Sequence, residues 1–380
     1  MMIQIKEKSN CCGCQACGDV CPKQAIAFKI DQEGFWYPEV DRHLCVDCGL
    51  CERVCPCLND KEPQRPFAVF AAVNPDEEVR MESSSGGVFW MLVKQTIEEG
   101  GVVFGAAFDE EWMVCHSSAE TLTDAKKYRG SKYVQSRLSG CYMEAQRVLK
   151  QGRKVLFSGT ACQIAGLKNY LNKDYPNLLN VDVVCHGVPS PGIWNDYIKL
   201  KSNNKDIRRI IFREKTSGWR NYDFLVDFSD GSNIRESHNR NLYMQGFLSD
   251  LYLRPACHNC KFKQGRCGSD MTLGDFWGIE KVFPNMDDNL GVSVVLVNSS
   301  RGESYLKKMD IIRKEVDYEN AVKENPCIIK STSKSKYRPL FMEKYQEGAE
   351  LNIISEIMKR IRPSKIKRLV QKAKSVLLHK

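Results

Sequence analysis

Cysteine is the residue that most limits what this chain can fold into. Of its 380 residues, eighteen are cysteine, and ten of these fall within residues 11–57. Residues 1–10 lack the apolar segment of a signal peptide, and no run of eighteen apolar residues occurs, so we expect neither secretion nor a membrane span. In a reducing, cytoplasmic setting thiols do not persist as disulfides, which makes metal ligation their expected role.

The cysteines of residues 11–57 form a duplicated run. The pattern C-x2-C-x2-C-x3-C-P spans residues 11–22 and occurs again over residues 45–56. Three thiolates at this spacing wrap around three irons of a 4Fe–4S cube, whereas the fourth lies too far along the chain and ligates the other cube. Two clusters are therefore predicted, one held by Cys11, Cys14, Cys17 and Cys55 and the other by Cys21, Cys45, Cys48 and Cys51.

A zinc site fits these runs poorly, because zinc generally takes its four ligands as two separated pairs. Cys12 and Cys57 stand outside the repeated pattern. We expect them to be small buried residues beside the clusters.

The rest of the chain predicts alternating strands and helices. Between the cysteine runs, residues 25–40 indicate a short hairpin, and a polar stretch at 59–66 is typical of a linker. Further strands are expected at 67–72, 102–108, 154–157, 180–184 and 292–297, with helices at 88–99, 141–151, 161–171 and from 303 onward. This succession is typical of an α/β domain with a largely parallel sheet. An antiparallel segment is expected at 208–237, with its turn at Asp230-Gly231.

Three parts follow: an α+β, ferredoxin-like dicluster module at 1–62, an α/β domain at 67–330 and a basic helical tail at 331–380. The tail contains 13 Lys and Arg against 4 Asp and Glu, which accounts for the whole net charge of +9. The remainder is neutral, so we do not expect a nucleic-acid-binding protein.

Two helices are predicted in the tail, at 350–362 and 364–378, separated by Pro363. The second is basic and amphipathic. Such a helix lies on an anionic membrane surface, here the inner face of the membrane, or docks on a partner, unless it packs on its own domain or frays.

A third set of cysteines lies in the α/β domain. Cys162 is expected where a strand passes into a helix and Cys185 at the end of the next strand, so both would lie at the carboxyl edge of the sheet, where ligands gather. Cys257 and Cys260 follow as a C-x2-C pair, with Cys267 close behind. Spacing alone leaves three possibilities open: a third iron–sulfur cluster, a zinc or redox dithiol site, and no metal.

Two short segments could bind a cofactor. Ser85-Gly86-Gly87 precedes a predicted helix, where free backbone amides and the helix dipole favour an anion, although many helices begin this way and bind nothing. Ser131-Lys132-Tyr133 offers a cation and an aromatic ring, but such a triplet is also ordinary at a surface. The absence of G-x-G-x-x-G and of a P-loop argues against a Rossmann site and NTP hydrolysis.

Taken together, six motifs give the chain a family resemblance. They are Ser85-Gly86-Gly87, Gly130-Ser131-Lys132-Tyr133, Gly159-Thr160-Ala161-Cys162-Gln163-Ile164, Val184-Cys185-His186-Gly187-Val188-Pro189, Cys257-x2-Cys260 and Ser269-Asp270-Met271-Thr272-Leu273-Gly274-Asp275. The chain resembles the family of coenzyme F420 hydrogenase/dehydrogenase beta subunits, in the form that carries a fused N-terminal dicluster ferredoxin. The resemblance covers most of residues 1–300.

The resemblance implies cofactors and roles for particular residues. It implies an FAD site around Ser85-Gly86-Gly87 and Ser131-Lys132-Tyr133, in which Lys132 bears on the flavin phosphate or ring. It implies His186 as a proton donor, although a histidine packed at a strand end serves equally as an explanation. It also implies a third 4Fe–4S cluster, held by Cys162, Cys185, Cys257 and Cys260.

The implied activity follows from these cofactors. A flavin exchanges hydride but also releases single electrons, whereas a cluster passes one electron at a time. We therefore expect an iron–sulfur flavoprotein oxidoreductase that joins a redox partner protein to a small-molecule hydride donor or acceptor. In similar proteins this molecule is often a deazaflavin; others reduce chlorophyll-type substrates, and others resemble proteins of surface-polysaccharide pathways. The alternatives are a non-catalytic electron-transfer subunit and a redox-responsive binding protein.

Overall fold

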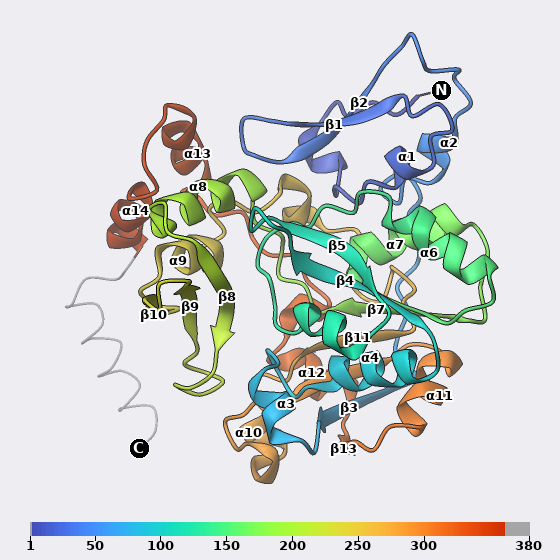
Figure 1. The fold of residues 1–380 in the computed structure, drawn as a ribbon, viewed down its shortest axis with the longest axis vertical. Helices are drawn as coiled ribbons and strands as arrows, with labels where there is room; N and C mark the ends of the chain where they lie inside the picture. Colours follow the sequence, from blue (N-terminus) through green and yellow to red (C-terminus); the bar gives the residue numbers. More distant parts are fainter. Residues whose placement is uncertain (1, 362–380) are drawn as a thin grey trace.

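The computed structural model describes residues 2–361, and the second predicted tail helix lies outside them. The N-terminal module forms one end of the molecule (Figure 1). It contains the predicted hairpin, β1 (Ile26–Ile30) paired antiparallel with β2 (Trp36–Val40). A one-turn helix carries the third cysteine of each triplet, α1 (Ala16–Asp19) in the first run and α2 (Leu50–Arg53) in the second.

The two cysteine runs fold alike because left-handed residues occupy matching positions in both. Gly13 and Gln15 flank the second cysteine of the first triplet with φ of 75° and 60°. Asp47 and Gly49 flank the second cysteine of the other triplet with φ of 50° and 72°. A residue with positive φ reverses the local backbone curvature, so the first two cysteines of each triplet lie in a tight loop rather than in a strand or helix.

An eight-stranded sheet forms the centre of the α/β domain, in the order β13-β3-β12-β11-β7-β6-β4-β5. Its strands are β3 (Ala68–Val73), β4 (Val102–Phe108), β5 (Val114–Ala119), β6 (Val155–Thr160), β7 (Leu178–Val183), β11 (Met271–Asp275), β12 (Ser293–Val297) and β13 (Ile312–Glu315). Neighbours among β4, β6, β7 and β11 pair in parallel, and antiparallel pairs flank them on both sides. The expected parallel core is confirmed, within a sheet that is mixed as a whole.

Helices cover both faces of this sheet, because successive strand residues point to opposite faces. Phe104 and Phe157 point to one face and pack with α6 and α7, which also contact the N-terminal module. Val103 and Leu156 point to the other face and pack with α4 and α11. These helices are α4 (Val88–Glu98), α6 (Cys141–Lys150), α7 (Ala161–Leu171) and α11 (Ser300–Lys307).

A smaller antiparallel sheet, in the order β10-β9-β8, lies beside the first (Figure 1). Its strands β9 and β10 join at the predicted turn, where Gly231 has a φ of 85°. Four helices share one apolar core with this sheet, and they include α14, in which Ile354 and Ile357 are buried. The elements are β8 (Ile207–Glu214), β9 (Asp223–Phe228), β10 (Asn233–Ser237), α8 (Pro191–Ser202), α9 (Leu242–Leu248), α13 (Arg338–Gln346) and α14 (Ile353–Ile361). The first predicted tail helix therefore packs on the domain.

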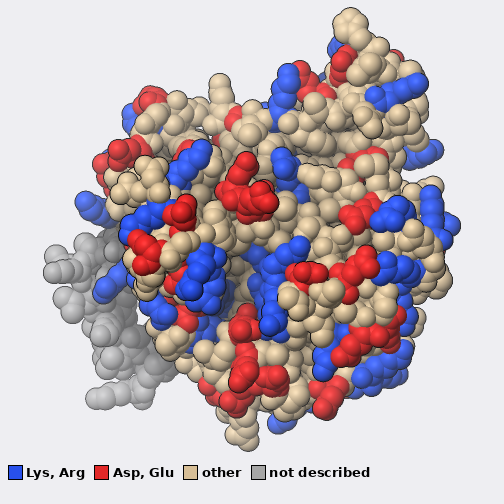
Figure 2. Space-filling model, viewed as in Figure 1, with Lys and Arg blue, Asp and Glu red and all other residues tan. Residues whose placement is uncertain are grey.

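Short helices complete the α/β domain, namely α3 (Glu77–Met81), α5 (Leu122–Ala125), α10 (Ile279–Val282) and α12 (Tyr318–Lys323). Figure 2 shows Lys and Arg interspersed with Asp and Glu over one face of the molecule. Among the helices of residues 2–361, none has both the length and the apolarity needed to cross a bilayer.

Candidate functional site

The thiols predicted for the first cluster gather at one place in the module. Burial and the neighbouring Cys11 and Cys55 raise the pKa of Cys17 well above its ordinary value. A hydrogen bond with Cys12 lowers the pKa of Cys14, but burial and the charges of Cys17 and Cys55 outweigh it and raise that pKa to about 11. Thiols that crowd together in this way destabilise one another as thiolates, and bound cations such as iron remove the penalty.

The thiols predicted for the second cluster line a separate small cavity. Cys21, Cys45, Cys48 and Cys51 surround it together with apolar residues of the hairpin. The backbone amides of Ala25 and Ile3 donate to the sulfurs of Cys21 and Cys51, each at 3.3 Å. Cys48 is exposed, whereas Cys14 and Cys17 of the first set are buried. The second set therefore lies nearer the molecular surface than the first.

A third set of four thiols surrounds a cavity at the carboxyl edge of the large sheet. Cys162 lies in the first turn of α7, Cys185 follows β7, and Cys257 belongs to a short 3-10 helix at Pro255–Asn259. These three and Cys260 line one cavity, as the strand order predicts. Burial and the other three thiols raise the pKa of Cys185 well above its ordinary value, although Lys263 opposes this.

Cys162 differs from the other thiols of this set. A hydrogen bond with Cys12 and one with Thr160 outweigh burial and lower the pKa of Cys162 to about 7. Its position in the first turn of a helix also favours a thiolate. The four sulfurs surround a volume rather than a point, and within residues 2–361 no three His, Cys, Asp or Glu side chains close around a single metal ion.

Cys12, Cys57 and Cys267 are cysteines outside the predicted ligand sets. Cys12 and Cys57 are buried, as predicted, and Cys12 lies between the module and the core, close to Cys14, Cys57 and Cys162. Cys267 is also buried, beside Asp182. It does not line the cavity of the four core thiols, and none of the eighteen cysteines forms a disulfide.

A larger cavity of about 570 Å³ adjoins the core thiols, and the two predicted cofactor segments line it. The second segment contacts the residue that precedes the first, because the amide of Ser131 donates to Ser84 Oγ at 2.6 Å. Gly87, with φ of 79°, is the N-cap of α4, and no side chain caps this helix end. The first amides of α4 therefore remain available at the cavity wall, where the helix dipole favours an anion.

Gly86 has a packing role rather than a binding role. Its amide donates to Ser293 Oγ at 3.0 Å, and a Cβ on Gly86 would lie 2.4 Å from the carbonyl oxygen of Ala72. The adjacent Ser85 hydroxyl donates to the carbonyl of Val292 at 2.9 Å. Contacts with β3 and β12 thus hold the loop in place.

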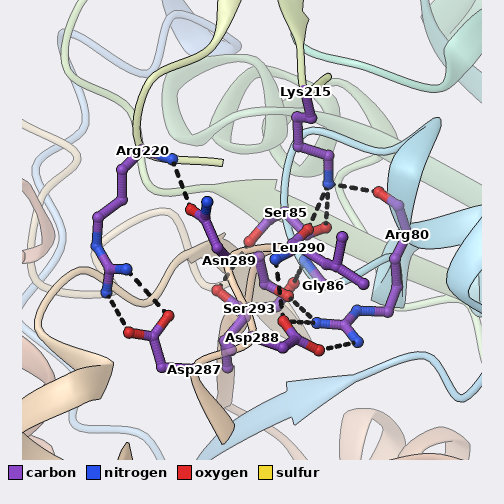
Figure 3. Close-up of polar contacts among 12 residues, drawn as sticks. Arg80, Ser85, Gly86, Lys215, Arg220, Asp287, Asp288, Asn289, Leu290 and Ser293 are labelled. Atoms are coloured by element: carbon purple, nitrogen blue, oxygen red, sulfur yellow. Dashed lines mark hydrogen bonds and ion pairs between the residues drawn. The ribbon is translucent and has the colours of Figure 1, made fainter. Parts of the chain in front are cut away.

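Figure 3 shows how a buried lysine that follows β8 joins this loop to the smaller sheet. The ammonium of Lys215 donates to the carbonyls of Arg80, Ser85 and Leu290, the last at 2.6 Å. Arg80 in turn forms a bidentate ion pair with Asp288, with both distances at 2.6 Å. Lys215 was not singled out by any sequence motif, because its role depends on carbonyl groups far away in the chain.

Lys132 lies at the wall of the larger cavity without a carboxylate partner. Its ammonium donates to the carbonyls of Arg129 and Gly130, both at 3.2 Å, which uses two of its three hydrogens. Burial lowers the pKa of Lys132 to about 7. The ring of the adjacent Tyr133 packs against Phe247, with centroids 4.8 Å apart. A partly desolvated cation facing a cavity favours an anionic ligand.

His186 lines both cavities and forms a network that the sequence did not reveal. Its Nε2 lies 2.6 Å from Asp250 Oδ1, and its Nδ1 lies 3.7 Å from the sulfur of Cys327. Thr332 donates to the second oxygen of Asp250 at 2.8 Å. Burial would lower the pKa of His186, but hydrogen bonds to Asp250 and Cys327 outweigh it and raise that pKa to about 9. The ring therefore carries two protons at neutral pH.

Known proteins resemble this chain in both parts. Residues 10–59 match the 4Fe–4S dicluster domain, and residues 152–324 match the C-terminal part of the coenzyme F420 hydrogenase/dehydrogenase beta subunit. The F subunit of the F(420)H(2) dehydrogenase of Methanosarcina mazei is 23% identical over 334 residues, which cover 83% of this chain and 86% of that protein. An uncharacterized ferredoxin of Methanocaldococcus jannaschii is 36% identical over 52 residues, or 14% of this chain and 66% of the ferredoxin.

Among solved structures, a chain of the F420-reducing NiFe hydrogenase complex from Methanosarcina barkeri is 19% identical, with a TM-score of 0.47 over 70% of this chain and 91% of that one. The two family matches lie in separate parts of the chain, the dicluster match first and the beta-subunit match after it. Residues 152–324 therefore belong to the C-terminal part of the coenzyme F420 hydrogenase/dehydrogenase beta-subunit family, and residues 10–59 to the 4Fe–4S dicluster domains.

Proposed function

We propose that this chain is an iron–sulfur flavoprotein oxidoreductase that couples a one-electron redox partner to a small-molecule hydride carrier. At the coarse level, the family and the dicluster domain support an oxidoreductase-type subunit that transfers electrons. One observation carries the finer proposal. The cavity lined by Ser85, Lys132 and the α4 N-terminus is also lined by Cys162 and Cys185, so a cofactor bound there would adjoin the core thiols.

The larger cavity fits a flavin nucleotide in size and in charge. Its volume of about 570 Å³ lies within the range of roughly 300–1,000 Å³ that is usual for ligand pockets. The uncapped amides of α4 and the ammonium of Lys132 would hold the diphosphate or an anionic edge of the ring. The Ser84–Ser131 hydrogen bond fixes these two groups relative to one another.

The four core thiols fit a third 4Fe–4S cluster. They come together from three separate elements around one cavity. Burial and the neighbouring thiols raise the pKa of Cys185, Cys257 and Cys260, so thiolates at these three positions are unfavourable without a cation. The amide of Val188 also donates to the sulfur of Cys257, at 3.4 Å. Amide hydrogen bonds to cluster sulfurs are a common means of setting the reduction potential.

When bound, a flavin would supply hydride exchange on one side and single electrons for the clusters on the other. The chain's own residues would provide position and protons. Asp250 orients the ring of His186 and keeps it protonated at neutral pH, so that His186 holds a proton at the edge of the cavity. Phe247 stacks on Tyr133 and contacts His186 edge-on, which fixes both rings.

The hydride carrier proposed for this site is a reduced deazaflavin. The similar Methanosarcina mazei protein is named as a subunit of an F(420)H(2) dehydrogenase, and the match extends over most of both chains. The same name favours a second candidate function, in which this chain is an electron-transfer subunit and a separate partner carries out the chemistry. The exposed position of Cys48 suits delivery of electrons to or from such a protein.

Anaerobic purification followed by iron and flavin determination tests the proposal. Three four-iron cubes give about twelve irons per chain, and we expect them together with one FAD. Eight irons without flavin would favour the electron-transfer subunit, and zinc as the only metal would contradict both functions. Reduction of a deazaflavin but not of a nicotinamide would then identify the hydride partner.

A further inference from the structure

Arg254 is a fully buried arginine at the junction between the N-terminal module and the α/β domain. It immediately precedes the 3-10 helix Pro255–Asn259, which carries the core thiol Cys257. Its guanidinium extends into the module and lies over the ring of Tyr37, 4.3 Å from the centroid. A cation so completely removed from water requires a compensating negative charge nearby.

The hydrogen bonds of Arg254 do not provide that charge from a carboxylate. Nε donates to the carbonyl of Cys11 at 2.6 Å, and one terminal nitrogen donates to Gln135 Oε1 at 2.9 Å. The other terminal nitrogen donates to the carbonyl of Trp36 at 3.1 Å and to the sulfur of Cys11 at 3.4 Å. The only one of these acceptors that can carry a negative charge is the Cys11 sulfur.

We propose that Arg254 is a positioning residue for electron transfer, whose fixed positive charge and sulfur hydrogen bond raise the reduction potential of the cluster held by Cys11. Reduction adds one electron to the cube and makes its net charge more negative by one. A guanidinium beside a ligand sulfur stabilises this reduced form more than the oxidised form. The inference rests on the assignment of Cys11 as a ligand within the dicluster domain.

The two clusters of the module differ in this respect. The sulfurs of Cys21 and Cys51 accept hydrogen bonds from neutral backbone amides, whereas the sulfur of Cys11 accepts one from a full cation. The first cluster also lies closer to the core: Gly166 of α7 approaches Cys14 so closely that a Cβ on it would lie 3.0 Å from the Cys14 Cβ. Arg254 would thus make the cluster next to the core the more readily reduced of the pair.

The local backbone is shaped to admit the guanidinium. A Cβ at Gly13, which has a φ of 75°, would lie 2.8 Å from a terminal nitrogen of Arg254 and 2.1 Å from Gln135 Nε2. Gln135 Nε2 itself faces the carbonyl of Cys12 at 3.3 Å. The cysteine loop, Gln135 and Arg254 therefore form one packed unit at the domain junction.

Redox titration of the full-length, anaerobically purified protein, monitored by EPR, tests this role. In Arg254→Gln the midpoint potential of one cluster should fall by at least the equivalent of tenfold in its reduction equilibrium, which is about 59 mV for one electron. Arg254→Lys keeps the charge on a shorter arm without the fork, so its midpoint should lie between those of Arg254→Gln and the wild type.

Arg338→Gln is the matched control. Arg338 is also a buried arginine at the domain junction, but it pairs with Glu33 of the module and contacts no cysteine. Its loss should leave every midpoint unchanged. Iron determination on Cys11→Ser tests the ligand assignment separately from this proposal. If Cys11 is a ligand, this variant should lose a cluster, and full iron content would contradict the assignment.

Midpoints equal to those of the wild type in iron-replete Arg254→Gln would overturn the proposal. If Arg254→Gln loses iron, Arg254→Lys decides: a lowered midpoint supports the role, and an unchanged one overturns it. An equal fall in Arg338→Gln would assign the effect to domain docking and would also overturn it.

Discussion

The N-terminal module and the core of the α/β domain both gather cysteines, but they do so by different means. In the module, the predicted ligands of two clusters all come from residues 11–55, in two loops of matching conformation. In the core, four thiols come from a helix start, a strand end and a separate short helix, within residues 162–260. The first arrangement depends on local spacing, whereas the second exists only once the sheet has formed.

This difference has a consequence for loss of a ligand. The core thiols have no neighbouring run that could supply a replacement at the same spacing. Cys162→Ser should therefore remove one whole cluster, about four irons per chain, while the two clusters of the module remain. Iron determination on anaerobically purified protein measures the loss.

Cys267→Ser is the control for that experiment, because Cys267 is buried in the same domain, beside Asp182 of the cavity wall, but does not itself line the core cavity. It should keep its full iron content. Unchanged iron in Cys162→Ser, or an equal loss in both variants, would contradict the proposed set of core ligands.

The same contrast explains how far the sequence could be interpreted. The duplicated run predicts the grouping of the module thiols, and residues 25–40 predict the hairpin, because both depend on residues close together in the chain. Apolar periodicity predicts the strand at 102–108, the helix at 161–171 and a strand at 180–184, which the structure places at Leu178–Val183. Their order places Cys162 and Cys185 at one edge. The short strands β5, β11 and β13 carry polar residues or glycine and give no such signal.

Other parts of the site could not be predicted, because their partners are far apart in the sequence. Asp250 and Cys327 meet His186 only in the folded chain, and neither belongs to a recognisable motif. Gly86 lies in a predicted anion-binding segment, but packing against Ala72 and Ser293 determines its role. Spacing reveals ligands within a loop, whereas the electrostatic surroundings of those ligands require the fold.

The larger cavity offers a second test, because Lys132 at its wall forms no ion pair within residues 2–361, whereas Arg129, which also lines the cavity, is paired with Glu82. Lys132→Met should weaken FAD binding by about tenfold to a hundredfold, since hydrogen bonds to charged groups contribute about 1.5–3 kcal/mol. Lys127→Met, which removes an exposed cation from the same segment, should bind FAD like the wild type. Fluorescence titration of flavin-depleted protein measures both affinities.

The affinity should also depend on pH. Burial lowers the pKa of Lys132 to about 7, so the free protein loses this positive charge as the pH rises above 7. Binding of an anion requires the protonated form, and the wild type should bind FAD more weakly at pH 9 than at pH 6. Lys132→Met should show no such trend over this range, and an equal pH dependence in both proteins would exclude Lys132 from the flavin site.

Substitution of His186 should have a smaller effect, which is limited to the supply of a proton during turnover. The pKa of His186 is raised to about 9, so turnover should change little from pH 7 to 8, fall to about half at pH 9 and decline further above it as the ring loses its proton. His186→Gln should be slower by about tenfold at pH 7, less than the roughly hundredfold or more that is usual for a general acid, and should lack the decline. A pH–rate profile of deazaflavin oxidation measures both features, and an unaltered decline in the variant would assign it to another group.

The free energy of unfolding should also depend on the protonation of His186. Because the folded-state pKa exceeds the ordinary value of about 6.5, the contribution of His186 is fully present below pH 6.5 and is lost as the pH rises through 9. The difference in unfolding free energy between the wild type and His186→Gln should shrink over that interval. The side chain is 34% exposed, so solvent screening reduces the size of the effect.

The smallest effect on iron content and stability is expected for substitution of Cys12. This substitution tests whether a thiol that lies close to a cluster is also one of its ligands. Cys12 is buried among thiols of the module and the core and is close to Cys14 and Cys162, yet it lies outside the repeated spacing. Cys12→Ala should keep all its iron and lower the free energy of unfolding by only about 1 kcal/mol, the cost of a small cavity. Cys14→Ala, two residues away, should lose a cluster. If Cys12→Ala also lost iron, the local spacing rule would fail at the point where the two regions meet, because a residue outside both ligand sets would then be holding a cluster.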